Sequence, residues 1–321
     1  MRGPRRGLTM RKRPRVLVLT LYSGEAEFDR CRSSLEQQEY PLWEQRIIEN
    51  LPNIEAHAQL YETIMAEHEN FKLFLKLDAD MVLADPKVLG DLVRVFEQRP
   101  ELDHLVVAVT DWMTDSRIIG AHLFSNRVRW KRHEETLYVD PDPEFPGRKL
   151  MVDNPPRDLI LHAGDPSPLQ AFHFGAHRAL QASQVYRKLG DARPHNARIQ
   201  WQYLDRVWDH YVQTGDRRLG LAMFAADMVF RKELPPTVNE YSDAALRAAF
   251  ERTEALGDGE IRERLAPRWG SPKVRRRTWA RALGPAKFVL VRIRGLRDAA
   301  ALTVKDLLGT SAPQVEIGSH A

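Results

Sequence analysis

The chain has 321 residues, of which 43% are hydrophobic and 29% charged, so it can bury a sizeable core and does not have a disordered composition. Its single cysteine, Cys31, excludes an intramolecular disulfide and a cysteine-based zinc site, which fits a reducing, cytoplasmic setting. The longest strongly apolar stretch, residues 219–230, is well short of the roughly 20 residues that cross a bilayer, and no signal peptide is expected.

The net charge of +4 conceals an acidic middle between two basic ends. Residues 1–15 hold seven Lys or Arg and no acids, whereas residues 273–321 hold ten against three acids. Subtracting both ends leaves residues 16–272 with a net charge of −10. Basic ends on an acidic body indicate either contact with an anionic surface or solubility alone.

Strands and helices are expected to alternate along the first third of the chain. The patterns predict strands at 16–22, 44–48, 71–77 and 104–110, with helices starting near residues 28, 54 and 86 between them. Residues 16–22 form a continuous apolar run, which is typical of a strand covered on both faces. The alternation predicts an α/β fold with a doubly wound, mostly parallel sheet and ligands at the carboxyl ends of its strands.

The pattern is looser beyond residue 110. We expect a strand at 117–124, a Pro- and Asp-rich connection at 140–158, and helices at 177–188, 197–212 and 243–256.

Two aspartates, Asp78 and Asp80, follow the strand at 71–77 directly. Two hard oxygen ligands on a short loop suit Mg²⁺ or Mn²⁺, the ions that accompany diphosphates. Asp-x-Asp is also common in solvated surface turns, so the motif alone does not separate the two interpretations. Its place at the carboxyl end of a strand favours the functional one.

Four segments carry a family resemblance when they are taken together. They are Val16–Tyr22, Ser34–Pro41 with its Ser-Leu-x-x-Gln-x-Tyr-Pro helix end, Arg46–Asn50, and Leu75–Leu83 around Asp-Ala-Asp. In this order they resemble the nucleotide-sugar glycosyltransferases of the GT-A fold, especially family 2, over residues 15–110. The resemblance implies a metal-dependent enzyme that moves a sugar, with inversion, from a nucleoside-diphosphate sugar to a glycan or lipid-linked acceptor.

Composition and the resemblance together predict a division of the chain. We expect a basic, disordered N-terminus at 1–14, a GT-A-like domain at 15–235 with a nucleotide half (15–110) and an acceptor half (111–235), and a helical, basic C-terminal extension at 236–321.

Roles for individual residues follow from matching positions. The loop from Thr20 through Tyr22 to Glu25 would line the nucleotide base pocket, and Glu49 would contact base or ribose. Asp78 would face ribose and metal, and Asp80 would bind Mn²⁺ or Mg²⁺ directly.

The chain departs from the family pattern in two places. Glu49-Asn50 stands where the family has paired acids, and Gln200-Trp201 stands where it has a Glu-Asp pair with the catalytic base. The base is therefore not identified by resemblance.

Candidates for the missing parts come from residues 111–178. The resemblance implies a histidine from the later half of the domain as a further metal ligand, and by position His173 is the first choice, with His162 and His177 behind it. All three could instead cap or pack beside aromatic residues, and Gly175 weakens a helix here. Arg178 could bind a phosphate or form a structural ion pair. For the base we rank Asp165 first, before Asp111 and Asp115.

The segment 273–306 interleaves basic residues with Trp and aliphatic residues. This pattern suits peripheral contact with an anionic membrane at the inner face, or a solvated helical hairpin packed on the body. No nucleic-acid motif accompanies the charge, so no nucleic-acid partner is expected.

Two other functions remain open at this point. A non-catalytic nucleotide-binding or scaffold protein of the same fold would explain Gln200-Trp201. A nucleotidyltransferase would need a Gly-rich phosphate loop after the first strand, and Leu21–Gly24 is a poor match to one.

Overall fold

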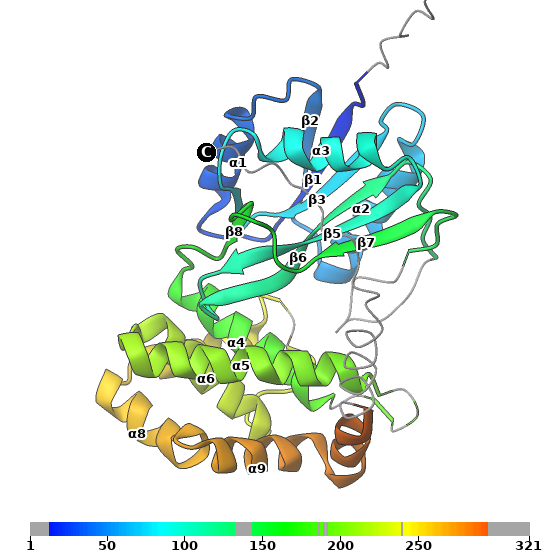
Figure 1. Cartoon of the computed structure of the whole chain (residues 1–321). Coiled ribbons are helices and arrows are strands. Elements are labelled where there is room, and N and C mark those ends of the chain that lie inside the picture. Colours follow the sequence, from blue (N-terminus) through cyan, green and yellow to red (C-terminus); the bar gives the residue numbers. More distant parts are fainter. Residues whose placement is uncertain are drawn as a thin grey trace, which may run out of the picture.

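The computed structural model describes residues 13–131, 143–184, 187–188, 190, 192–238 and 240–294 (Figure 1). Nearly all of the basic N-terminus expected to be disordered, and the part of the basic tail beyond residue 294, lie outside these residues. Within the described part of the chain, every helix is too short or too polar to traverse a lipid bilayer.

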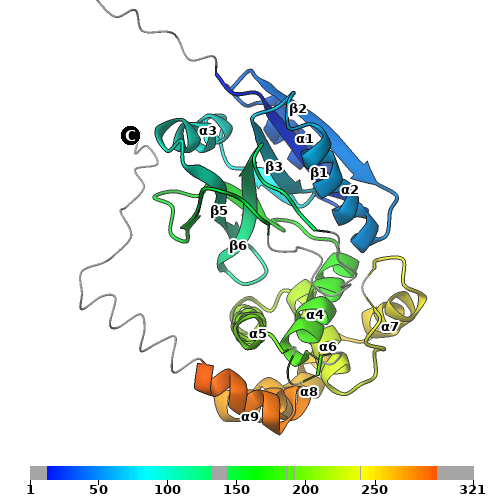
Figure 2. The same ribbon diagram turned by 90° about the vertical axis from the view of Figure 1, so that its right-hand side faces the viewer.

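Residues 16–162 form an eight-stranded sheet with helices on both faces. α1 and α3 cover one face and share a hydrophobic core with it, and α2 covers the other face (Figures 1 and 2). In chain order the elements are β1 (Val16–Tyr22), α1 (Phe28–Glu36), β2 (Trp43–Glu49), α2 (Asn53–Ala66), β3 (Leu73–Asp78), β4 (Met81–Leu83), α3 (Val88–Gln98), β5 (Leu102–Asp111), β6 (Ser116–Ser125), β7 (Arg148–Val152) and β8 (Ile160–His162).

The strand order is β2-β1-β3-β6-β5-β8-β4, with β7 also paired to β5. Only β4 and β6 run against the other strands of this sheet. The expected mixed α/β fold with a mostly parallel sheet is therefore confirmed. The sequence patterns did not predict β4, β7 and β8, and β7 lies within the stretch expected to be a connection.

The helical half of the described chain lies below the sheet in Figure 1, with α4, α5 and α6 nearest to it and α8 and α9 farther away. A further helical stretch, residues 285–294, follows α9. The bounds are α4 (Pro168–Ser183), α5 (Pro194–Thr214), α6 (Arg217–Phe230), α7 (Ala244–Glu254), α8 (Asp258–Trp269) and α9 (Pro272–Leu283).

α4 begins well before the expected start at residue 177. Ser167 caps it in a reciprocal pair with Gln170, and Pro168 occupies the first turn, both of which favour a helix start. Gly175 does not break this helix. A β-carbon there would overlap the carbonyl oxygen of Ala222 on α6, so glycine is what allows the two helices to touch backbone to backbone.

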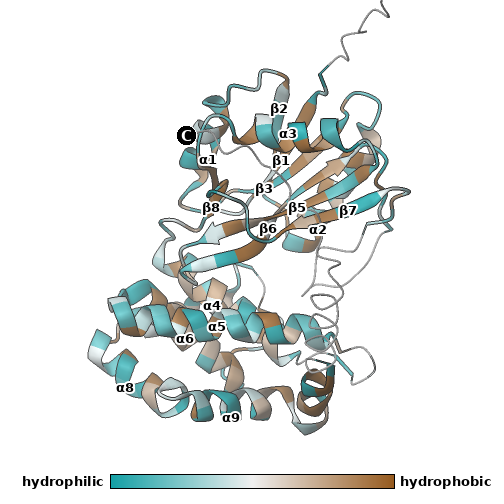
Figure 3. Ribbon diagram, in the orientation of Figure 1, coloured by the Kyte–Doolittle hydropathy of each residue, from teal (hydrophilic) through white to brown (hydrophobic). Residues whose placement is uncertain are grey.

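One hydrophobic core joins α4, α5 and α6 to α7, α8 and α9. Figure 3 shows apolar residues among the polar ones in the labelled helices of this half. The chain thus packs across the domain boundary expected at residue 235, and the division into domains remains a prediction.

Candidate functional site

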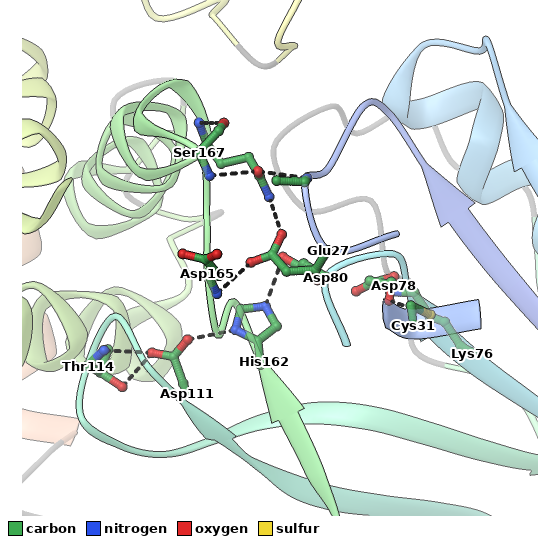
Figure 4. Close-up of polar contacts among 12 residues, drawn as sticks. Glu27, Cys31, Lys76, Asp78, Asp80, Asp111, Thr114, His162, Asp165 and Ser167 are labelled. Carbon is green, nitrogen blue, oxygen red and sulfur yellow. Dashed lines mark hydrogen bonds and ion pairs between the residues drawn. The ribbon is translucent and has the colours of Figure 1, made fainter. Parts of the chain in front are cut away.

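The candidate site lies at the carboxyl ends of β1, β3, β5 and β8, on the side of the sheet that faces α4. Asp78 ends β3, Asp111 ends β5 and His162 ends β8, while Glu25 and Glu27 follow β1. Asp80 joins them because its carbonyl accepts a hydrogen bond from Ala163 N at 3.0 Å. Figure 4 shows the side chains of Glu27, Asp78, Asp80, Asp111 and His162 close together, although they come from separate strands and loops.

His162 is held between two carboxylates. Its Nδ1 lies 2.6 Å from Asp111 Oδ1, and its Nε2 lies 3.4 Å from Asp80 Oδ2. Asp111 is fully buried, and its other oxygen accepts hydrogen bonds from the Thr114 backbone at 2.8 Å and hydroxyl at 2.6 Å. Strand register makes the pair, since Asp111 on β5 lies opposite His162 on β8.

This arrangement sets the protonation of both partners. Burial alone would lower the pKa of His162, but the charges of Asp80 and Asp111 outweigh it and raise the pKa to about 9. Burial alone would raise the pKa of Asp111, but hydrogen bonds from His162 and Thr114 hold it below its usual value. His162 is therefore a buried cation that donates to Asp111 at neutral pH.

Asp78 and Asp80 keep unused ligand capacity. Among the described residues, neither Asp78 Oδ1 nor Asp80 Oδ1 has a hydrogen-bond donor, although both atoms are buried. Lys76 Nζ lies 3.8 Å from Asp78 Oδ1. Burial, together with the charges of neighbouring carboxylates, raises the pKa of Asp80 to about 6. Buried carboxylate oxygens without a donor are costly unless a cation or proton satisfies them.

Cys31 lies below this pair on α1. Its thiol is fully buried and its Sγ is 4.0 Å from the carbonyl of Asp78. Burial, with added repulsion from Asp80 and Asp78, raises the pKa of the thiol to about 12.

Glu27 connects the loop after β1 to the start of α4. Its carboxylate accepts from Gln170 Nε2 at 2.9 Å and from the backbone of Asp165 at 3.1 Å. Gln170 Oε1 in turn accepts from Ala26 N at 2.9 Å and Ser167 N at 2.9 Å (Figure 4). The capped end of α4 is thereby fixed against the sheet edge.

Glu25 lies nearer the open side of the site. Burial raises its pKa to about 7 against an opposing hydrogen bond from Ser23 N, and the charges of Asp80 and Asp78 add to the rise. It is thus a carboxyl that exchanges its proton near neutral pH.

A cavity of about 530 Å³ separates these acids from α4 and α5. Its volume is in the range of small-molecule sites. Residues that line it on the helical side include His173, His177, Arg178, Asn196 and Gln200.

Arg178 is the notable cation of this wall. Its Nη1 donates to Gln200 at 3.0 Å, and its guanidinium lies 4.7 Å from the centre of the Phe174 ring and 5.5 Å from that of Tyr203. In the described part of the molecule no carboxylate is within ion-pair distance, and its buried Nε has no acceptor. Burial lowers the pKa of Arg178 from its usual value. An anionic group of a ligand would provide the negative charge and the hydrogen-bond acceptor that Arg178 lacks among the described residues.

The donor set fits a dication that is completed by a ligand. No three His, Cys, Asp or Glu side chains of the described residues are grouped to hold a metal ion by themselves. Mg²⁺ and similar ions commonly take one or two carboxylates and fill the remaining positions with water and substrate phosphates. The orphaned oxygens of Asp78 and Asp80 match that pattern.

The structure brings together some of the expected site residues. Glu25, Asp78, Asp80, His173 and Arg178 all line the cavity. The ring of His173 lies 4.4 Å from that of Tyr241, and His162, rather than His173, is the histidine beside Asp80. The role of His173 as a metal ligand remains a prediction.

Other expected residues do not line the cavity. Asp111 is the last residue of β5 and is engaged with His162, Asp115 is exposed, and Asp165 is exposed and pairs with Arg218 at 2.7 Å. Their role as base remains a prediction. Three residues expected to contact the nucleotide also do not line the cavity. Thr20 is buried, Tyr22 stacks on Phe28, and Glu49 is exposed.

Sequence reasoning missed several residues of the site. Glu27, Lys76, Glu240 and Tyr241 belong to it or its walls, and Glu240 accepts from the backbone N of Asn53 at 2.8 Å. None of the four has a local signal. The capping box of Ser167 and Gln170 marks the start of α4 in the sequence but does not indicate that Gln170 binds Glu27. All four are joined to the site by contacts distant in sequence.

Comparisons with known proteins assign no family. No protein-family model matches the chain, and no curated protein matches it. Among solved structures, it overlaps a mannosyltransferase, PcManGT from Pyrobaculum calidifontis in complex with GDP-Man and Mn²⁺, with 14% identity over 90% of this chain and 88% of the other. The TM-score is 0.35, which is too low to establish a shared fold.

Proposed function

We propose that the protein is a metal-dependent glycosyltransferase that takes a sugar from a nucleoside-diphosphate donor to a glycan or lipid-linked acceptor. One observation carries the proposal. Across a single cavity, Asp78 and Asp80, each with a buried oxygen that accepts no hydrogen bond from a described residue, lie opposite Arg178. Lys76 is 3.8 Å from the Asp78 oxygen, whereas the Arg178 guanidinium has no charged partner among the described residues.

A metal-bound diphosphate matches both walls at once. Asp78 and Asp80 would hold Mn²⁺ or Mg²⁺, and Arg178 would bind a phosphate oxygen, for which its planar fork is suited. When bound, such an ion supplies positive charge that stabilises the departing diphosphate. Without it, the carboxylates of this wall would repel the ligand.

The remaining cavity residues suit a sugar and an acceptor. Gln200 and Asn196 offer amide groups for hydroxyls, and Asn53 and His57 line the opposite end near β1. Glu25 is the lining carboxyl with a pKa of about 7, so it can take the proton of an acceptor hydroxyl at neutral pH. Asp165 could act as the base only after its ion pair with Arg218 is broken.

Calorimetric titration with a panel of nucleoside diphosphates, with and without Mn²⁺, tests the proposal. We expect one nucleotide to bind in a Mn²⁺-dependent way and Asp80→Asn to weaken that binding at least tenfold. Arg178→Lys, which keeps the charge but loses the fork, should weaken it about tenfold, since one hydrogen bond to a charged group contributes about 1.5 kcal/mol at the low end.

Asp153→Asn is the matched control, since Asp153 is exposed and away from the cavity. Binding of no nucleotide, or binding that is indifferent to both Mn²⁺ and Asp80→Asn, would contradict the proposal.

A non-catalytic nucleotide-binding protein is the second candidate. It is favoured by the positions of Asp111, Asp115 and Asp165, none of which lines the cavity. Metal-dependent binding with no sugar transfer to any acceptor, and an unchanged donor hydrolysis rate in Glu25→Gln, would support this candidate over the enzyme.

A further inference from the structure

A second cavity, of about 340 Å³, lies between α5, α9 and the helical residues 285–294. Its lining is aromatic on one side. Trp201 and Trp279 stack with ring centres 5.2 Å apart and planes 8° from parallel, and Phe288 meets Trp279 edge-on at 5.4 Å. Asp205 and Pro272 also line it.

Two exposed arginines, Arg276 and Arg292, complete this lining. Asp205 forms no ion pair with either of them; the cation nearest to its carboxylate is Arg275, whose Nε is 3.5 Å away. Neither Arg276 nor Arg292 has an ion pair with any described residue. The cavity therefore combines aromatic walls with one carboxylate, Asp205, and two arginines that form no ion pair with a described residue.

The surface around the cavity is strongly basic. Residues 272–294 contain eight Lys or Arg and no Asp or Glu. Arg275 pairs with Asp209 at 2.7 Å, and Lys287 donates to the carbonyl of Gln184 at 2.8 Å. The others are exposed, without an ion pair to the described part of the chain: Lys273, Arg276, Arg277, Arg281, Arg292 and Arg294.

The same surface exposes aliphatic side chains. Val289 is 54% exposed and Ile293 is 48% exposed, and their spacing of four residues places them on one face of the helix. This helix, at the lower right of Figure 3, is among the most hydrophobic of the helical half. Phe288 and Arg292 form the adjacent row, which lines the cavity.

We propose that α9 and residues 285–294 form a surface that binds an anionic phospholipid membrane. A lipid phosphate would lie between Arg276 and Arg292, its glycerol against Trp279 and Phe288, and Val289 and Ile293 would enter the interface. This inference goes beyond the proposed function and does not depend on it.

Two observations favour a bilayer over other occupants. A small soluble anion could bind in the cavity, but it would not contact Val289 and Ile293. It would also not contact the exposed basic residues outside the cavity lining. The chain beyond residue 294 cannot neutralise the surface either, because residues 295–321 carry a net charge of only −1. Basic residues beside exposed aliphatic ones match an anionic interface.

Co-sedimentation of the full chain with phosphatidylcholine vesicles, with and without about one third phosphatidylserine, tests the proposal. We expect binding to the anionic vesicles alone, weakened by salt. Arg276→Gln with Arg292→Gln should lower it about 25-fold, since each basic residue near such a surface contributes a factor of about five. Val289→Ser with Ile293→Ser should lower it about tenfold.

The pair Arg247→Gln and Arg252→Gln, exposed on α7 away from α9, is the matched control for charge and should bind as the wild type does (Figure 2). Circular dichroism checks that each variant is folded. Equal binding to both kinds of vesicle, or unchanged binding of the Arg276/Arg292 variant, would overturn the proposal. Calorimetric binding of glycerol phosphate as tight as vesicle binding would also overturn it, in favour of a soluble ligand.

Discussion

The sheet half and the helical half meet across the first cavity with opposite charges, and they fix those charges in different ways. On the sheet side, strand register places Asp111 opposite His162, and short hydrogen bonds lock both. On the helical side, Arg178 is held by aromatic faces and a single hydrogen bond to Gln200. The acids of the site and the His162 cation therefore depend on backbone pairing, whereas the position of the Arg178 guanidinium depends on how the helices pack.

The largest effect should come from removing Asp111, which binds His162 and Thr114 in the sheet half. Asp111→Ala leaves the His162 cation buried without its main partner, so we expect a loss of about 4 kcal/mol in the free energy of unfolding. Urea denaturation measures it. In a double-mutant cycle with His162→Ala, the loss should shrink strongly; additive losses would mean that the two side chains do not act as a pair.

The corresponding test of the helical half is Gly175→Ala. The new β-carbon would collide with the Ala222 backbone and push α4 from α6, which should cost about 3 kcal/mol, the upper range for overpacking. Gly164→Ala is the control, because a β-carbon there meets no atom within 4 Å. Equal stability of the two variants would show that the α4–α6 contact is looser than described.

Asp80→Asn sharpens the comparison by relieving charge at the sheet edge. Asp80 keeps its proton up to about pH 6 in the folded protein but only to about pH 4 when unfolded, so its ionisation destabilises the fold as the pH rises between those values. We expect the variant to be about 3 kcal/mol more stable than the wild type at pH 7.5, with no such gain at pH 4. Thermal unfolding at both pH values measures this; a gain at neither pH would contradict it.

The smallest effect concerns His104, a buried histidine whose Nε2 lies 3.0 Å from Nδ1 of His122, a residue that lines the first cavity. His104 stacks on Phe124 at 4.6 Å, and its pKa is lowered to about 2 by burial and by the charges of His122 and Lys149. The folded protein holds it neutral while the unfolded chain protonates it near pH 6.5, so stability falls as the pH drops below that value. His104→Asn should remove about 1 kcal/mol of the loss between pH 6.5 and 5.5. Parallel unfolding curves at the two pH values would argue against this.

The sequence predicted those parts of the fold that have long periodic signals. β1, β3, β5 and β6 are apolar runs with clear ends, and the main helices show regular stripes. β4, β7 and β8 are only three to five residues long. Such short strands exist because partners distant in sequence pair with them, so no local pattern marks them. Gly175 argued against a helix in the sequence, yet it lies within α4. Glycine is needed there because α6 packs against it, and that contact is not visible in the local sequence.

Of the candidate site, the sequence predicted only the part at the end of β3. Asp78 and Asp80 lie there, and the alternation of strands and helices along the chain was enough to place this end at the ligand-binding edge of the sheet. The place of His162 beside Asp80 depends on β8 lying between β5 and β4, which nothing near residue 162 encodes. The same holds for Glu240 and Tyr241, which reach the cavity from beyond α6.

The burial of Cys31 beneath Asp78 has a practical consequence. A fully covered thiol with a pKa of about 12 is almost entirely protonated at neutral pH, and only the thiolate reacts with alkylating reagents. The wild-type chain should therefore react only very slowly with thiol reagents. A cysteine introduced at Ile293 would take up an environment-sensitive fluorophore selectively, and its emission would report the polarity met by that helix without removal of any native residue from α1.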